Sequence, residues 1–159
     1  MTEARAPKGA AVRFPPPFVP LIALAVGLLL HGFVWPFGLN VAGPARYGSG
    51  ALLAASGLGL MAAALRLFRR SRQDPAPWES TPEILSTGIY AFTRNPMYLG
   101  MGFFQAGLGV ALDNGWVVAL VVPVWVAIYW IAVRHEERYL EGKFGSVYSD
   151  YKSSVRRWM

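Results

Sequence analysis

The chain has 159 residues, the size of one domain, and no cysteine, which excludes disulfide bonds, thiolate metal sites and a cysteine nucleophile. Hydrophobic residues make up 54% of it and charged residues only 15%. A soluble domain of this size needs more charge than that to cover its surface, so the composition favours a protein that lies in a membrane.

The first part of the chain, residues 1–17, is a basic arm that ends in three consecutive prolines. A proline run is typical of an extended polyproline segment, so we expect a mobile arm here and no helix. The rest, residues 18–159, is predicted to be a single membrane domain.

Four stretches of this domain are apolar and almost free of charge, at about residues 18–35, 48–68, 96–112 and 115–135. A membrane-spanning helix needs about 20 apolar residues, with a working range of roughly 17–25. The sequence therefore predicts an all-α integral membrane protein with four transmembrane helices.

The basic residues support four crossings. Fourteen of the fifteen lysines and arginines lie before the first stretch, from the end of the second to the start of the third, or at and beyond the end of the fourth, and only Arg46 lies elsewhere. Four crossings place these fourteen on one side of the membrane, which the positive-inside rule assigns to the cytosol. Both termini are then cytosolic, in the inner membrane if the cell is bacterial. The formal net charge of +6 reflects this topology and is a poor footprint for nucleic acid, so membrane lipids are the expected surroundings.

The polar segment 69–96 contains three prolines, which disfavour a long helix. At its end, Asn95 is a good helix N-cap and Pro96 is favoured at the first helical position, so the third helix is predicted to begin here. A bare helix cap is an alternative reading of this dipeptide.

A tight turn at Asp113–Gly115 predicts an antiparallel hairpin of the third and fourth spans. The start of one span must then lie near the end of the other. Beyond residue 135 the helical periodicity continues into a cytosolic tail helix that reaches about residue 157. The hairpin brings together two polar clusters: Tyr90, Arg94, Asn95 and Tyr98 in one, and Arg134, His135, Glu136, Glu137 and Arg138 in the other.

Two features in or next to these clusters have alternative interpretations. The adjacent carboxylates of Glu136 and Glu137 repel each other, so they either form a solvated turn balanced by the flanking arginines or face a cavity and bind a cation. Gly100 and Gly102 either pack against a neighbouring helix or let a ligand approach the backbone.

The run from Gly88 to Gly100, GIYAFTRNPMYLG, resembles the GxYxxxRHPxYxG signature of the isoprenylcysteine carboxyl methyltransferase and phospholipid methyltransferase superfamily of integral membrane enzymes. About forty residues later Glu136-Glu137 matches the paired glutamates of these enzymes, and Phe144 to Lys152 matches their FGxxYxxYK tail. The resemblance covers roughly residues 82–157, half of the chain.

The resemblance implies an enzyme that transfers a methyl group from S-adenosyl-L-methionine to a lipophilic small molecule or lipid and releases S-adenosyl-L-homocysteine. It implies no metal. By position, Glu136 and Arg94 are the expected catalytic residues. The expected cofactor-binding residues are Leu85, Tyr90, Asn95, Pro96, Met97, Tyr98, Gly100, Gly102 and Glu137.

The chemistry of the cofactor agrees with these residue types. S-adenosylmethionine carries a sulfonium, an ammonium and a carboxylate. Glutamates suit the two cations, Arg94 suits the carboxylate, and tyrosine faces attract a sulfonium through cation–π interaction. Methyl transfer is an in-line displacement, so catalysis depends mostly on positioning and on the exclusion of water.

Two positions depart from the family pattern. The usual histidine is Asn95 here, and the arginine about one turn before the paired glutamates is Ala132, so the resemblance leaves the methyl acceptor open. An NADPH-dependent reductase of the sterol-reductase type is the alternative enzyme, expected to carry more arginine and lysine for the 2′-phosphate. A non-enzymatic membrane scaffold is the alternative from another class.

Overall fold

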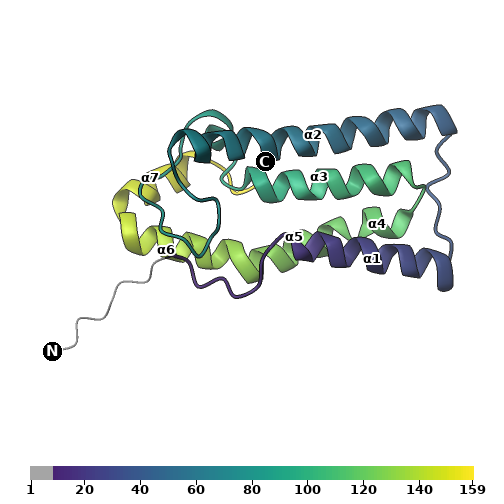
Figure 1. Cartoon of the computed structure of the whole chain (residues 1–159), viewed down its shortest axis with the longest axis horizontal. Helices are drawn as coiled ribbons and strands as arrows, with labels where there is room; N and C mark the ends of the chain where they lie inside the picture. Colours follow the sequence, from purple (N-terminus) through teal and green to yellow (C-terminus); the bar gives the residue numbers. More distant parts are fainter. Residues whose placement is uncertain (1–8) are drawn as a thin grey trace.

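The computed structural model describes residues 9–159, and these residues are helical with no strand among them, as predicted. Three long helices lie side by side, α1 (Phe18–Phe33), α2 (Gly43–Arg70) and α3 (Pro96–Ala111) (Figure 1). A fourth rod runs along them from Gly115 to Phe144. It consists in succession of α4 (Gly115–Ala119), α5 (Val121–Ile128), the π-helical turn η2 (Tyr129–Val133) and α6 (Arg134–Phe144).

Two helices of the described chain are long and apolar enough to cross a membrane, Gly43–Arg70 and Gly115–Phe144. Helix α1 is apolar but shorter, with 16 residues, and α3 has the same length. Large apolar side chains point outward, among them Leu21 at 58% and Leu52 at 69% exposure, as expected of a surface that lipid covers. The four-span topology and its orientation stay a prediction.

Helices α2 and α3 pack closely against each other through glycines. A Cβ atom added to Gly57 would lie 2.5 Å from the carbonyl oxygen of Gly100, and one added to Gly107 would lie 2.4 Å from the backbone nitrogen of Ala54. Small residues thus let the two backbones touch, the arrangement that stabilises helix pairs in lipid.

The predicted hairpin turn is present between α3 and α4. Asp113 has a positive φ of 53°, and its carboxylate accepts a hydrogen bond of 3.0 Å from the backbone N–H of Leu39. The buried side chain of Asn114 caps α4 by accepting from the N–H of Val117 at 3.1 Å, and it donates to the carbonyl of Gly27 on α1 at 3.2 Å. The turn therefore also fastens α1 to the hairpin.

The end of the N-terminal arm packs against the bundle, unlike the free arm expected from the proline run. In the segment Gly9–Pro17, here called the N-terminal strap, Ala10 and Val12 are only 5% and 8% exposed. The N–H of Ala10 donates to the carbonyl of Pro77 at 2.8 Å, and the two buried side chains form one hydrophobic cluster with Ala132. The strap contains no helix, as expected, while residues 1–8 of the predicted arm lie outside the described residues.

The predicted single tail helix is divided in two by Gly145. Its φ of 55° is a conformation that glycine adopts without strain, and it ends α6 and begins α7 (Ser146–Ser154). The chain then continues without helix through residues 155–159, which return to the start of α3. Together with the short 3-10 helix η1 (Gly88–Ala91), these segments cover one end of the bundle.

Candidate functional site

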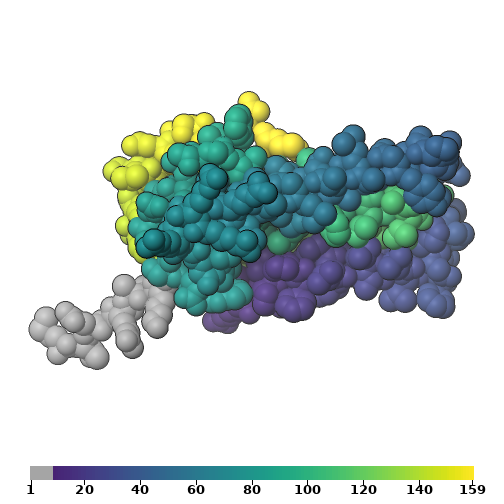
Figure 2. Space-filling view, turned by 45° about the horizontal axis from the view of Figure 1, so that its top comes forward, coloured from purple at the N-terminus to yellow at the C-terminus, as the bar shows by residue number. Residues whose placement is uncertain are grey.

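A cavity of about 340 Å³ lies at this covered end of the bundle, between α2, α3, α6, the loop that follows α2 and the N-terminal strap. The loop, in teal, forms the surface over this end in Figure 2. Ligand pockets have volumes of roughly 300–1,000 Å³, so a drug-sized molecule fits. The expected site residues among its lining are Leu85, Tyr90, Arg94, Asn95, Met97, Tyr98, Glu136 and Glu137.

The remaining three expected residues lie outside this lining. Pro96 is buried at the first position of α3, where its ring starts the helix. A Cβ on Gly100 would lie 2.6 Å from the carbonyl oxygen of Gly57, and one on Gly102 would lie 2.4 Å from the Trp125 ring. Both glycines therefore face neighbouring helices, as in the packing alternative, and their contact with a cofactor stays a prediction.

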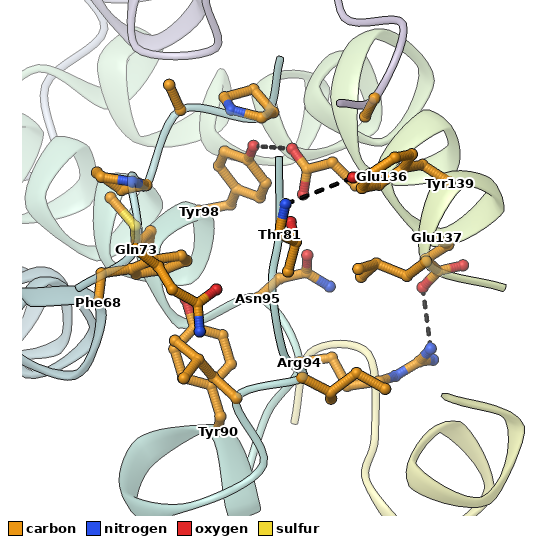
Figure 3. Close-up of a pocket in the computed structure, with 18 of the residues that line it drawn as sticks. Phe68, Gln73, Thr81, Tyr90, Arg94, Asn95, Tyr98, Glu136, Glu137 and Tyr139 are labelled. Carbon is orange, nitrogen blue, oxygen red and sulfur yellow. Dashed lines mark hydrogen bonds and ion pairs between the residues drawn. The ribbon is translucent and has the colours of Figure 1, made fainter. Parts of the chain in front are cut away.

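Tyr98 and Glu136 meet across the cavity, from α3 and α6 (Figure 3). The Tyr98 hydroxyl donates a hydrogen bond to Oε1 of Glu136, and the backbone carbonyl of Tyr98 accepts one of 3.1 Å from Nε1 of Trp125. Among the described residues, no arginine or lysine forms an ion pair with Glu136. Within the described chain, its carboxylate thus faces the cavity with the phenol of Tyr98 as its hydrogen-bond donor.

Glu137, its neighbour, is held by two arginines. Arg157 donates from Nε and Nη2 to the two carboxylate oxygens at 2.8 and 3.0 Å, and Nη1 of Arg94 lies 3.1 Å from Oε1. Bidentate arginine–carboxylate pairs of this kind are among the strongest polar contacts in proteins. The two glutamates therefore point inward, which excludes the solvated-turn alternative. Of this pair, Glu136 is the one without an ion-pair partner in the described part of the chain.

Arg94 was expected to hold the carboxylate of a cofactor, but its side chain, 8% exposed, lies against Glu137. Its Nε and Nη1 atoms make no hydrogen bond within the described chain. Tyr148 of α7 is 2% exposed beside this pair, and burial, aided by the charge of Glu137, raises the pKa of its hydroxyl to about 12. Burial and then the charge of Glu136 raise the pKa of Tyr90 as well, so both phenols stay neutral at physiological pH.

Asn95 takes the N-cap position of α3, as predicted, but its side chain makes no capping hydrogen bond. Its Nδ2 donates instead to the backbone carbonyl of Arg157 at 3.0 Å, which also accepts from the Thr93 hydroxyl at 3.2 Å. The position uses a hydrogen-bond donor, which the histidine of the family pattern also carries.

The π-helical turn η2 immediately precedes the two glutamates. A π-helical turn accommodates one extra residue in the helix, and this changes the direction in which the following side chains point. Such turns recur at functional sites, and this one lies where the helix supplies Glu136 to the cavity and Glu137 to the arginines.

Two polar residues of the site have no signal in the sequence. Gln73, just after α2, is 7% exposed and lines the cavity, and neither its amide oxygen nor its amide nitrogen has a hydrogen-bond partner in the described chain. Arg157 counts in the sequence only as one basic residue among several. A lone glutamine in a loop and a basic residue near a terminus are too common to stand out.

This arrangement is a helical bundle with a mostly apolar cavity at one end. Within the described residues, its polar groups include tyrosines, an amide without a hydrogen-bond partner and the Glu136 carboxylate, which forms no ion pair. Residues 45–147 match the phospholipid methyltransferase family, and the chain belongs to that family. The match confirms the resemblance seen in the sequence.

Two relatives share part of the chain. One is the protein-S-isoprenylcysteine O-methyltransferase of Saccharomyces cerevisiae, 31% identical over 77 residues, which are 48% of this chain and 32% of the yeast enzyme. The other is an uncharacterized protein of Haemophilus influenzae, 35% identical over 63 residues, which are 40% of this chain and 100% of that protein. The similarity thus spans about a third of the yeast enzyme.

Proposed function

We propose that this protein is an S-adenosylmethionine-dependent methyltransferase that modifies a lipophilic small molecule or a lipid at the cytosolic boundary of the membrane. The observation that carries the proposal is the pairing of Tyr98 with Glu136 across the cavity, where no lysine or arginine among residues 9–159 forms an ion pair with the carboxylate. Membership of a methyltransferase family supports the type of reaction.

The residues of the cavity fit the cofactor by their chemistry. The Glu136 carboxylate and the faces of Tyr90 and Tyr98 suit a molecule with a sulfonium and an ammonium. The amide of Gln73 has an acceptor oxygen and a donor nitrogen without partners among the residues that the structure describes, which suits the edge of a nucleobase. When bound, the cofactor supplies a methyl group on a positively charged sulfur.

The protein contributes positioning, exclusion of water and a proton acceptor. The loop after α2 and the N-terminal strap cover the cavity, through lining residues such as Leu85 and Ala10. A carboxylate or thiolate acceptor needs no base, whereas an amine or hydroxyl must lose a proton. For these acceptors we assign the proton to the Glu136 carboxylate, which meets Tyr98 across the cavity.

We place residues 18–159 in the membrane as one domain with four spans, at about 18–35, 48–68, 96–112 and 115–135, and with both termini in the cytosol. The support is that α2 ends in Arg69 and Arg70 at the same end of the bundle as the cavity, where Arg94 and Arg138 also lie. A water-soluble cofactor then arrives from the cytosol and a lipophilic acceptor from the bilayer, in a bacterial cell the inner membrane.

Calorimetric titration of the purified full chain in detergent with S-adenosylhomocysteine and, separately, with NADPH tests the proposal. We expect saturable binding of S-adenosylhomocysteine and none of NADPH. Binding of NADPH alone would identify a reductase, and binding of neither would leave a scaffold. A labelled-methyl screen over lipid extracts then finds the acceptor.

A pair of tyrosine variants ties this binding to the cavity. Tyr98→Phe removes the hydroxyl that holds Glu136 and should weaken binding of S-adenosylhomocysteine several-fold. Tyr47→Phe is the matched control, because Tyr47 is 60% exposed at the other end of the bundle and donates to no site residue. Equal affinity of the two variants would contradict the placement of the cofactor.

A further inference from the structure

The last five residues, Val155–Met159, here called the C-terminal latch, lie against the start of α3. The backbone N–H of Arg94 donates to the carbonyl of Arg156 at 3.0 Å. The next carbonyl, that of Arg157, accepts from the side chains of both Thr93 and Asn95. The latch therefore fixes the backbone that enters the cavity wall at Asn95.

The side chains of the latch reach the other wall. Arg157 holds both carboxylate oxygens of Glu137, and its guanidinium lies 5.1 Å from the centre of the Tyr129 ring in η2. The ring of Trp158 lies 6.2 Å from that of Trp125, the residue that donates to the backbone of Tyr98. One short segment thus contacts both helices that supply the Tyr98–Glu136 pair.

We infer that Arg157 is a positioning residue of the methyltransferase site: with Arg94 it neutralises Glu137, so that Glu136 is the member of the adjacent glutamate pair that remains available to a cationic cofactor. The inference rests on the proposed function and extends it to a part of the chain outside residues 45–147, which match the family.

The reason is electrostatic. Adjacent carboxylates disfavour each other's ionised form, and this repulsion is strong when both are removed from water. Glu137 is 12% exposed, so it needs compensation by cations. Among the residues that the structure describes, the titratable groups around the two carboxylates are Tyr90 of η1, Arg94, Tyr98 of α3, Tyr139 of α6, Tyr148 of α7 and Arg157. Of these, only the two arginines are cations.

The geometry also requires an arginine in particular. Nε and Nη2 of Arg157 form two parallel hydrogen bonds with Glu137, which a lysine ammonium cannot reproduce. Lysine keeps the positive charge but cannot form the two parallel hydrogen bonds. Arg157→Lys therefore tests the effect of the charge separately from that of the bidentate geometry.

The test measures binding of S-adenosylhomocysteine by the full chain between pH 5 and 8, together with the thermal midpoint. Removal of the cation in Arg157→Gln is expected to weaken binding of S-adenosylhomocysteine about tenfold. The pH below which binding is lost on acidification should also rise. Arg157→Lys should recover most of the pH profile. Arg156→Gln is the matched control, because the exposed Arg156 contributes only its backbone carbonyl.

The double variant Arg157→Gln/Glu137→Gln removes the cation and the carboxylate together, so the pH profile and much of the affinity should return. If Arg157 only stabilises the fold, Arg157→Gln should lower the thermal midpoint and leave the pH dependence of binding unchanged. The double variant should then bind no more tightly than Arg157→Gln. Either result overturns the inference. If Arg157→Gln does not fold, the lysine and double variants carry the same comparison. Binding by the wild type and Arg156→Gln with no effect of Arg157→Gln refutes this inference alone, whereas no binding by the wild type refutes the proposed function and this inference with it.

Discussion

The two ends of α3 have different roles in the same bundle. From Gly100 onward the helix presents glycines to α2, and the two backbones touch so closely that no side chain fits between them. At its start, Asn95 and Tyr98 face a cavity and hold polar partners. One end supplies packing with no room for a ligand, and the other supplies room and chemistry.

The partners of the two ends also differ in origin. The glycine contact joins α2 to α3 along their lengths, and a regular pattern of small residues specifies it. The cavity end receives the strap from the N-terminus and the latch from the C-terminus, through Ala10 and Arg157. A close-packed helix pair gives a rigid frame, and the chain termini complete the site on that frame.

The largest effect is expected at the cavity end, from Glu136→Gln. The amide keeps the size of the side chain and loses the charge that suits a cationic cofactor. Methyl transfer should fall by a factor on the order of 10² or more, about 3 kcal/mol. The thermal midpoint without ligand should stay the same or rise, because a buried carboxylate without a cation is costly.

Glu141→Gln is the matched control for that variant, since Glu141 pairs with Lys152 at the surface and its side chain is 42% exposed. Labelled-methyl assays and thermal unfolding of both variants give the comparison. Similar losses of activity in the two would contradict the division between the ends of α3.

A smaller effect, on folding, is expected from Gly107→Ala at the packed end. The added methyl would lie 2.4 Å from the backbone of Ala54, so the helices must separate, at a cost of about 1–3 kcal/mol of unfolding free energy. Gly59→Ala, on the face of α2 with nothing within 4 Å, should be neutral or stabilising by up to about 1 kcal/mol. Detergent-titration unfolding measures both, and a Gly107→Ala variant as stable as Gly59→Ala would show that the close contact is dispensable.

Local patterns in the sequence predict much of this structure. The helical class, the turn at Asp113–Gly115 and the start of α3 at Asn95–Pro96 each follow from residues near one another in the chain. The hairpin then places Tyr98 next to the paired glutamates. The particular partner, Glu136 instead of Glu137, depends on the direction of each side chain after η2, and periodicity alone does not resolve a π-helical turn.

Contacts between segments that are distant in the chain could not be predicted from the sequence. Nothing in the residues around Ala10 or Arg157 indicates that they meet Pro77 and Glu137, because such pairs follow no period and obey no turn rule. For the same reason the sequence left Gly100 open between packing and a ligand. The membrane topology stays a prediction, since helix lengths in the structure support spanning only for Gly43–Arg70 and Gly115–Phe144.

The smallest effect is expected from Gln73→Leu, and its two consequences have opposite signs. Without ligand, leucine replaces a buried amide whose polar atoms have no partner within residues 9–159, so the thermal midpoint should rise. With ligand, the hydrogen bonds that the amide would make to the nucleobase are lost, so affinity for S-adenosylhomocysteine should fall roughly fivefold, about 1 kcal/mol. Gln105→Leu is the matched control: Gln105 is 2% exposed but donates to the carbonyl of Val117 at 3.0 Å, so its loss should lower the midpoint and leave affinity unchanged. A lower thermal midpoint for Gln73→Leu with unaltered affinity would show that this glutamine stabilises the fold. The bound cofactor would then not extend to the loop after α2.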